Sequence, residues 1–270
     1  SHITLGLFDA SALIQTFRLQ SRREQTADEY ALALGGLLEL AGHARIQVAH
    51  AVIASVVPTL AGVLVRAVKR AFDCDALMVS AATDTGVVLA VDRPHEVGVD
   101  RIVNVVAARE QALIEAGLTG AKAGARLPAG AIVVDLGTAT TLDCVSPSGE
   151  FVGGVIVPGM RVSFDALVGR TAQLRDVEFV APPRVLGKNT AECLQSGIVF
   201  GYASLVDGLV SKLRAELPFA CRVIATGGLA TVVAPHATSI ERVDSDLTLR
   251  GLHFIHTREL SRRPPRRQGE

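Results

Sequence analysis

The stretch AIVVDLGTATT, residues 131–141, decides the fold class. Its apolar start predicts a buried strand over Ala131–Asp135, and Gly137 lets the backbone after that strand turn close to a ligand. The N–H groups of such a turn, with the hydroxyls of the threonines around it, suit phosphate oxygens. Asp135, at the strand end, can hold a cation or its hydration water. A polar β-turn with aspartate as turn former gives the same pattern, so the motif alone leaves both interpretations open.

An internal repeat strengthens the functional interpretation. Residues 142–145 and 151–157, on either side of a Ser-Pro-Ser-Gly turn, predict a hairpin, and a shift of 138 residues places it on a second predicted hairpin, 3–8 and 13–19. Two such units facing each other would form a cleft between domains, a common place for ligands. The second copy is preceded by the strand and the Asp-x-Gly turn. We therefore expect a matching strand and turn ahead of Ser1, and expect the 270-residue chain to have weak activity without them.

The remaining periodicities predict helices alternating with strands. Thr26 and Glu29 have the spacing of a capping box that opens a helix ending near Leu40. Further helices are expected over 58–71, 100–116, 163–167 and 190–216, and strands over 45–57, 76–80, 87–91 and 222–225. This pattern indicates an α/β protein with domains over 1–117 and 118–257 and a basic, disordered tail over 258–270.

Composition excludes several classes of protein. Lys+Arg and Asp+Glu both number 27, which argues against a nucleic-acid partner. The longest apolar run, Ala51–Val65, is too short for a bilayer and is broken by Pro58 and Gly62, so no membrane partner is expected. The four cysteines are widely spaced, which fits a reducing cytoplasm better than a disulfide framework or a zinc site.

Three further segments have both a structural and a chemical interpretation. Asp100, in Gly98-Val99-Asp100-Arg101, could be a helix cap. It could also be a base that accepts an alcohol proton, with Arg101 as the cation that binds an acidic substrate. Thr190, after Gly187-Lys188-Asn189, could be an N-cap, or could place a helix N-terminus against an anion. Thr226-Gly227-Gly228 could be a glycine turn or a backbone platform for adenine.

Together these segments resemble the type III pantothenate kinases, relatives of the Bvg accessory factor. The resemblance runs from Ser1 to about His256, and its motifs are 26–29, 55–58, 94–104, 135–141, 153–159, 187–190 and 225–228. It implies duplicated actin-like domains of the acetate and sugar kinase, Hsp70 and actin superfamily (the ASKHA, ribonuclease H-like fold) around a central cleft. It also implies ATP-dependent phosphorylation of pantothenate to 4'-phosphopantothenate, the first step of coenzyme A biosynthesis, in a cytoplasmic homodimer.

The resemblance also assigns roles to residues. Asp100 matches the general base, and Gly98, Val99, Asp100, Arg101 and Thr190 match pantothenate contacts. Asp135 matches a ligand of a monovalent cation, K+ or NH4+, and Thr138 matches an ATP contact that Mg2+ accompanies. Ser1, His2, Ile3 and Thr4 match the second half of the first phosphate loop, whose strand, aspartate and glycine are absent from this sequence.

Two alternatives remain at this point. A nucleotide-binding regulator like the Bvg accessory factor, without turnover, would fit the incomplete first loop. An actin- or Hsp70-like ATPase would lack the 98–101 segment. Within the long helix from Thr190, the stripe Gly197, Gly201, Leu205 and Leu209 packs either inside the chain or in a twofold homodimer.

Overall fold

The structure is a computed structural model that describes residues 2–22, 24–43, 48–118, 126–171 and 174–262. The chain forms two compact units, each built from separate segments. Unit 1 comprises Ser1–Gly86, Arg93–Ala107 and Thr248–Glu270, and unit 2 comprises Val87–Asp92 and Ala108–Leu247. This division differs from the expected domains 1–117 and 118–257, because a C-terminal segment packs back on unit 1.

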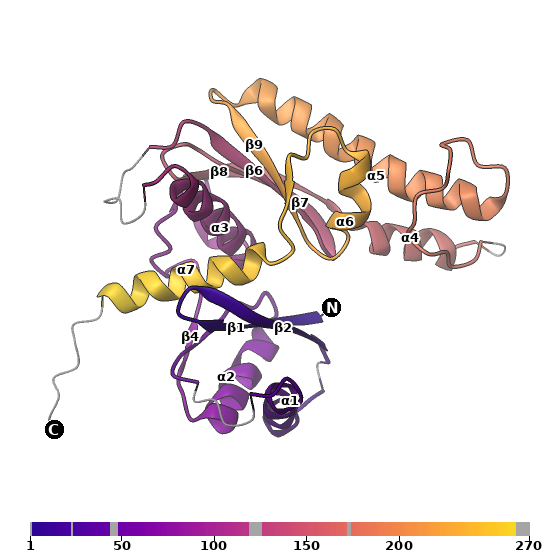
Figure 1. The fold of residues 1–270 in the computed structure, drawn as a ribbon. Coiled ribbons are helices and arrows are strands. Elements are labelled where there is room, and N and C mark those ends of the chain that lie inside the picture. Colours follow the sequence, from indigo (N-terminus) through magenta and orange to yellow (C-terminus); the bar gives the residue numbers. More distant parts are fainter. Residues whose placement is uncertain (1, 23, 44–47, 119–125, 172–173, 263–270) are drawn as a thin grey trace, which may run out of the picture. The chain divides into compact units, whose positions relative to one another are not determined.

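Unit 1 begins with the expected hairpin, β1 (His2–Asp9) and β2 (Ala12–Gln20), which are antiparallel (Figure 1). Helix α1 (Ala27–Leu40) follows, and its capping box is confirmed: the Thr26 hydroxyl accepts from the Glu29 N–H, and the Glu29 carboxylate accepts from the Thr26 N–H. Helix α2 (Pro58–Phe72) separates two short parallel strands, β3 (Ala51–Ile53) and β4 (Ala76–Met78).

The core of unit 1 lies on its helices. The buried residues of one cluster come from α1, from α2 and from Cys74, which lies between α2 and β4. They are Tyr30, Leu34, Leu60, Leu64, Ala67, Val68 and Cys74. Residues of β1 and β3 pack against this cluster but remain partly exposed. The expected buried strand over 45–57 is wrong in extent, since pairing with β4 fixes only Ala51–Ile53 as strand; residues 44–47 lie outside the described part.

The C-terminal helix α7 (Leu247–Arg262) corrects the expected tail, because residues 258–262 are helical. From Thr248 onward it belongs to unit 1, where the Thr248 hydroxyl donates to Asn104 Oδ1 at 2.7 Å. The Arg258 guanidinium pairs with Asp84 at 3.3 Å and holds the last turns. Asn104 lies in α3 (Val99–Glu115), which follows a 3-10 turn over Pro94–Glu96. Residues 263–270 lie outside the described part of the chain.

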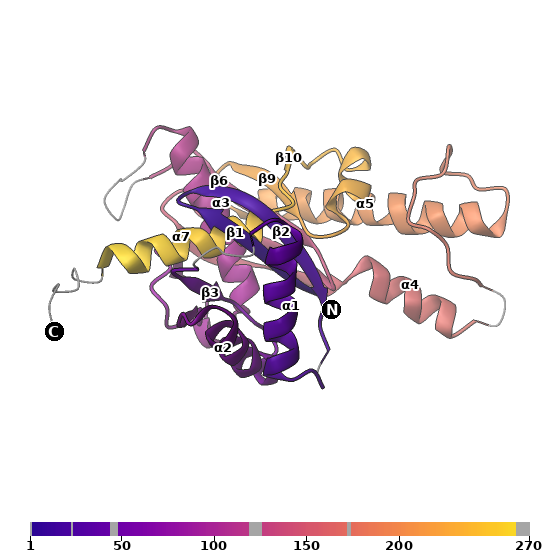
Figure 2. The same cartoon turned by 60° about the horizontal axis from the view of Figure 1, so that its bottom comes forward.

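Unit 2 contains a six-stranded sheet in the order β10-β9-β6-β7-β8-β5. Figure 2 labels three of its strands, β10, β9 and β6. Its strands are β5 (Val88–Leu89), β6 (Gly130–Leu136), β7 (Ala139–Val145), β8 (Glu150–Pro158), β9 (Cys221–Thr226) and β10 (Arg242–Val243). Its helices are α4 (Met160–Gly169), α5 (Thr190–Glu216) and α6 (Ala230–Val233), the last followed by a 3-10 turn over Ala234–His236. The mixed α/β class expected from the sequence is confirmed.

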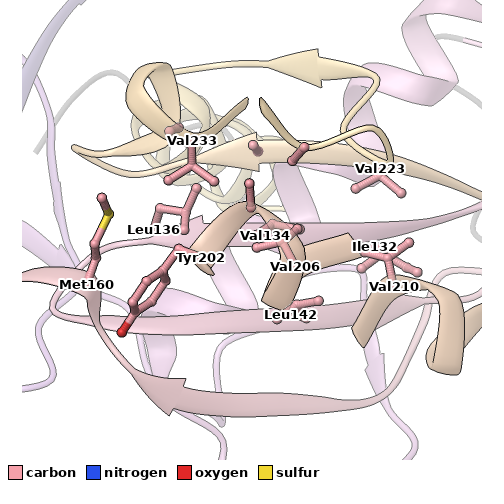
Figure 3. Packing of buried hydrophobic residues seen from close by; sticks show 14 of the residues in the cluster. Ile132, Val134, Leu136, Leu142, Met160, Tyr202, Val206, Val210, Val223 and Val233 are labelled. Atoms are coloured by element: carbon pink, nitrogen blue, oxygen red, sulfur yellow. The ribbon is translucent and has the colours of Figure 1, made fainter. Parts of the chain in front are cut away.

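The central strand of this sheet is buried on both faces. Ile132, Val134 and Leu136 are at most 1% exposed and pack in one cluster with Val206 and Val210 of α5 (Figure 3). Their neighbours Ala131 and Val133, on the other face of β6, are also buried. The strand end, and therefore Asp135, is held on a rigid scaffold.

The hairpin repeat is present in the structure. Shifted by 138 residues, β8 falls on β2 residue for residue, while the register of β7 with β8 differs by one residue from that of β1 with β2. Each hairpin has an irregularity close to its turn, between Leu7 and Phe8 in one and between Cys144 and Val145 in the other.

Candidate functional site

Two glycines from distant parts of the chain lie very close to the end of β6. Gly227, after β9, has φ +92°, and a Cβ there would lie 2.5 Å from Asp135 Oδ1 and 2.6 Å from the Leu136 carbonyl carbon. Gly159, at the start of α4, lies so close to the carbonyls of Gly137 and Thr138 that no Cβ would fit. We call Asp135, Gly137, Thr138, Gly159 and Gly227 the glycine cradle. At Gly159 and Gly227 only a residue without a side chain fits.

Neighbouring strands supply further oxygens to this edge of the sheet. Asp135 is paired in register with Thr141 of β7 and Thr226 of β9. The Thr141 hydroxyl donates to Asp143 Oδ2 at 2.9 Å, and both residues are buried. The buried Thr140 hydroxyl has no hydrogen-bond partner among the described residues. By this register Asp135, Thr141 and Asp143 lie on one face of the sheet, and Thr140 lies on the other with Leu136. The first face therefore offers carboxylate and hydroxyl oxygens, which hard cations prefer.

Asp135 and Thr138 stand on either side of Leu136 and Gly137, where β6 turns into β7. Thr138 is exposed in the turn between β6 and β7, where the Gly137 N–H donates to the Ala139 carbonyl at 3.1 Å. Helix α4 begins directly after Gly159, so its free N–H groups lie beside the turn and favour an anion there.

Asp100 lies in unit 1, in the first turn of α3, and its side chain is exposed. Gly98 precedes the helix, and its carbonyl accepts the first helical hydrogen bond, from the Ile102 N–H at 3.2 Å. Asp100 Oδ1 accepts from the Arg101 N–H at 2.9 Å. Gly98 rather than Asp100 thus occupies the cap position, which leaves the Asp100 carboxylate facing solvent within the first turn.

Thr190 is the first residue of α5 and not its cap. The cap is Asn189, whose Oδ1 accepts from the Glu192 N–H at 2.9 Å, while the Glu192 carboxylate accepts from the Lys188 N–H. Asparagine takes this position because its amide oxygen reaches the third N–H of the helix. Thr190 is exposed, and its hydroxyl does not cap the helix.

The segment expected to form half of a phosphate loop is a strand in the structure. His2, Ile3 and Thr4 pair with Gln20, Leu19 and Arg18, and Ile3 packs on the helical cluster of unit 1. Strand pairing leaves only the His2 and Thr4 side chains exposed. Ser1 lies outside the described residues.

The part of Gly159 and Gly227 in the cradle was missed by sequence reasoning. Both glycines stand in segments that the sequence analysis singled out, at 153–159 and 225–228, but their contacts with residues 135–138 arise from strand order and not from spacing. The sequence signal that could have indicated these contacts is a glycine directly after a predicted strand.

The family model for type III pantothenate kinase matches residues 1–212. Type III pantothenate kinases from Anaeromyxobacter sp. (strain Fw109-5) and Myxococcus xanthus (strain DK1622) are 41% and 40% identical over 258 residues. Each alignment covers 96% of this chain, and 96% and 95% of the relatives. The chain belongs to the type III pantothenate kinase family.

A solved structure supports the fold. A protein from Campylobacter jejuni that carries the name of a Baf family transcriptional activator superposes with a TM-score of 0.53 at 17% identity, covering 92% of this chain and 93% of that one. Membership of the kinase family assigns the chain the phosphorylation of pantothenate in coenzyme A synthesis, and the class of enzyme implies ATP and a divalent metal ion.

Proposed function

We propose that this type III pantothenate kinase binds the phosphates of ATP at the turn between β6 and β7, and that Asp100 accepts the proton of the pantothenate hydroxyl. The glycine cradle carries the proposal, because it places a carboxylate, an exposed threonine and the start of a helix at one strand end. Phosphoryl transfer depends mainly on positioning and on neutralising charge, and a rigid oxygen-lined turn provides both.

The residues at this turn fit the cations that the chemistry needs. The Asp135 carboxylate and the carbonyls of Gly137 and Thr138 are all oxygen donors. We assign the monovalent ion, K+ or NH4+, to Asp135, and a phosphate contact to Thr138. Mg2+, when bound with the nucleotide, would neutralise charge on the transferred group. The protein's own part is to orient that group, and Gly159 and Gly227 let neighbouring backbone lie close to the turn because they have no side chain.

Asp100 suits the role of base because no ion pair to its carboxylate is found among the described contacts. Its one described hydrogen bond comes from the neighbouring N–H, and the start of α3 favours a negative charge in its first turn. Arg101 and the backbone of residues 98–99 would hold the carboxylate of pantothenate, and the Thr190 hydroxyl would contact the same substrate.

We also propose a homodimer that buries one face of α5. A Cβ added at Gly197 or Gly201 would meet nothing within 4 Å, so these glycines do not serve close packing inside the chain. Leu205 and Leu209 of the same stripe are only partly buried against the core of unit 2, so the stripe keeps exposed surface for a partner. A monomeric mass in light scattering at micromolar protein would contradict the dimer.

We place the enzyme in the cytoplasm, where ATP and pantothenate meet. Among the described residues, α5 alone is long and apolar enough to cross a bilayer. Its buried residues pack in the core of unit 2, as in the core helix of a globular enzyme.

The decisive experiment measures ADP formation with and without pantothenate. A kinase gives pantothenate-dependent turnover, an actin- or Hsp70-like ATPase gives turnover without pantothenate, and a regulator binds ATP without turnover. Asp100→Asn tests the base, with Glu39→Gln as the matched control, since Glu39 is an exposed carboxylate of α1 in the same unit. Equal loss in both variants would refute a specific role for Asp100.

A further inference from the structure

A cavity of about 430 Å³ lies within unit 2, between α3 and the edge of the sheet where β6 begins. Its helix wall includes Ala108 and Ala112, one turn apart on α3, and its sheet wall includes Ala131 and Val145, which are paired across β6 and β7. Small side chains on both walls leave the space between them open. The glycine cradle lies at the other end of β6, since Asp135 is about 13 Å along the strand from Ala131.

Gln111 brings a buried oxygen without a partner to this cavity. The residue is 8% exposed and lines the cavity. Its Nε2 donates to Asp244 Oδ2 at 2.7 Å, whereas its Oε1 has no hydrogen-bond partner among the described residues. Rotation of the amide group would not relieve this, because a carboxylate accepts hydrogen bonds and therefore requires Nε2 to face it. A buried acceptor without a donor is costly, so a ligand that supplies an O–H or N–H group here would be favoured.

Arg109 is a second buried polar residue that lines the cavity with an unsatisfied atom. It is 7% exposed, and its Nη1 donates to Glu110 Oε1 at 2.8 Å. Its Nε has no acceptor in the described part of the chain. Two incompletely bonded polar side chains in one largely apolar cavity are typical of a binding site, which combines apolar walls with a few placed polar groups.

A cation stands at the rim of the cavity. The Glu115 carboxylate is shared by two arginines, Arg222 Nη1 at 3.0 Å and Arg242 Nη1 at 2.7 Å. Arg242 has a second carboxylate within reach, because its Nη2 lies 3.8 Å from Asp244 Oδ2. Arg222 has only its share of Glu115 among the described residues. Arg222 is therefore the guanidinium that remains available to an anionic group of a ligand.

We propose that this cavity binds a small apolar carboxylic acid that carries a hydroxyl group. The hydroxyl donates to Gln111 Oε1, the apolar body lies between α3 and the sheet, and the carboxylate pairs with Arg222. Gln111 and Glu115 are one turn apart on α3, so the hydroxyl and the carboxylate must be separated by at least about 5.4 Å. A planar aromatic ring between the two groups meets this requirement and fits a gap between a helix and a sheet. The inference does not depend on the proposed function.

The test uses 6-hydroxy-2-naphthoate as the probe, whose own fluorescence can be followed because the chain has no tryptophan. We expect saturable binding to the full chain by fluorescence anisotropy. Two matched compounds are 2-naphthoate, which lacks the hydroxyl, and 6-hydroxy-2-naphthalenemethanol, which lacks the carboxylate. Each should bind at least about threefold more weakly, since each loses one polar contact. A cavity that holds only water would give no saturable binding, and displacement of the probe by ATP or pantothenate would place it in the kinase site; either result would overturn the proposal.

Variants of the cavity locate the probe. Ala112→Leu should weaken binding at least about tenfold, because the larger side chain occupies the ligand's space. Its control is Ala215→Leu, at an exposed alanine of α5, which should bind as the unmutated chain does.

Arg222→Gln should weaken binding of 6-hydroxy-2-naphthoate by about two- to fivefold, as expected for an exposed ion pair, and leave binding of the uncharged alcohol unchanged. Its control is Arg184→Gln, at an exposed arginine of unit 2 that does not line the cavity. Arg222 is exposed, so this variant tests the site even if Ala112→Leu does not fold. Equal binding of all three compounds, or unchanged binding in a folded Ala112→Leu protein or in Arg222→Gln, would overturn the proposal.

Discussion

Replacement of Gly227 by alanine should destabilise unit 2 and disturb Asp135 together. The residue has φ +92°, where a side chain costs about 1–2 kcal/mol. The new Cβ would also lie 2.6 Å from the Leu136 carbonyl carbon and 2.5 Å from Asp135 Oδ1, and backbone cannot move away as a flexible side chain can. Overpacking of this kind adds about 1–3 kcal/mol. The total of about 2–5 kcal/mol is a large share of the stability of an ordinary domain.

The assay is thermal and urea unfolding followed by circular dichroism, since the chain has no tryptophan. A loss of 3 kcal/mol should lower the melting temperature by about 6–12 °C. Gly36→Ala is the control: Gly36 lies within α1, a Cβ there meets nothing within 4 Å, and alanine should stabilise the helix by about 0.5–1 kcal/mol. A Gly227→Ala protein within 0.5 kcal/mol of the unmutated chain, with full activity, would refute the cradle.

Three further predictions concern carboxylates. Asp100→Asn should keep the fold and ATP binding but lower pantothenate-dependent turnover by roughly 10²–10⁴-fold, and a variant within threefold would leave Asp100 as a helix residue only. The unmutated enzyme should run faster in KCl than in NaCl, and Asp135→Ala should lose that preference with most of its activity, while Asp165→Ala, an exposed carboxylate of unit 2, should keep both; equal rates in the two salts would contradict the cation site. Burial alone would raise the pKa of Asp207, but hydrogen bonds from Ser239 and Thr238 outweigh it and hold the pKa below its usual range. Stability from this group is therefore full above an unfolded pKa of about 3.9 and is lost as the pH falls through the lower folded value, so Asp207→Asn should flatten the decline of the melting temperature below about pH 4.

Local signals predicted much of the fold to within a residue or two. The capping box at Thr26 and Glu29, the bounds of α5 and the strand before Asp135 all depend on neighbours within a few positions. The repeat placed β2 and β8 correctly because two hairpins with the same turn spacing need no knowledge of the sheet.

Features set by distant contacts were not predictable in this way. The apolar run before Val57 indicated a long buried strand, but only the residues with a partner in β4 are strand. The helix through Arg262 depends on ion pairs with Asp84, far away in the sequence. The cradle needs Gly227 and Asp135 in adjacent strands, and only the strand order brings them together.

The way unit 1 is divided along the chain has a consequence for synthesis on the ribosome. Unit 2 ends at Leu247, whereas unit 1 still requires Thr248 to pair with Asn104 and Gly251 to pack on the Val103 carbonyl. The amino-terminal segment of unit 1 therefore cannot complete its packing until Thr248 and the residues after it have been synthesised, later than the whole of unit 2. Until α7 has left the exit tunnel, the apolar side chains of unit 1 are open to chaperones and to other nascent chains. A chain cut off at residue 247 and freed from the ribosome should retain all of unit 2 but lack the α7 segment of unit 1, so its amino-terminal half should be the part most exposed to proteolysis.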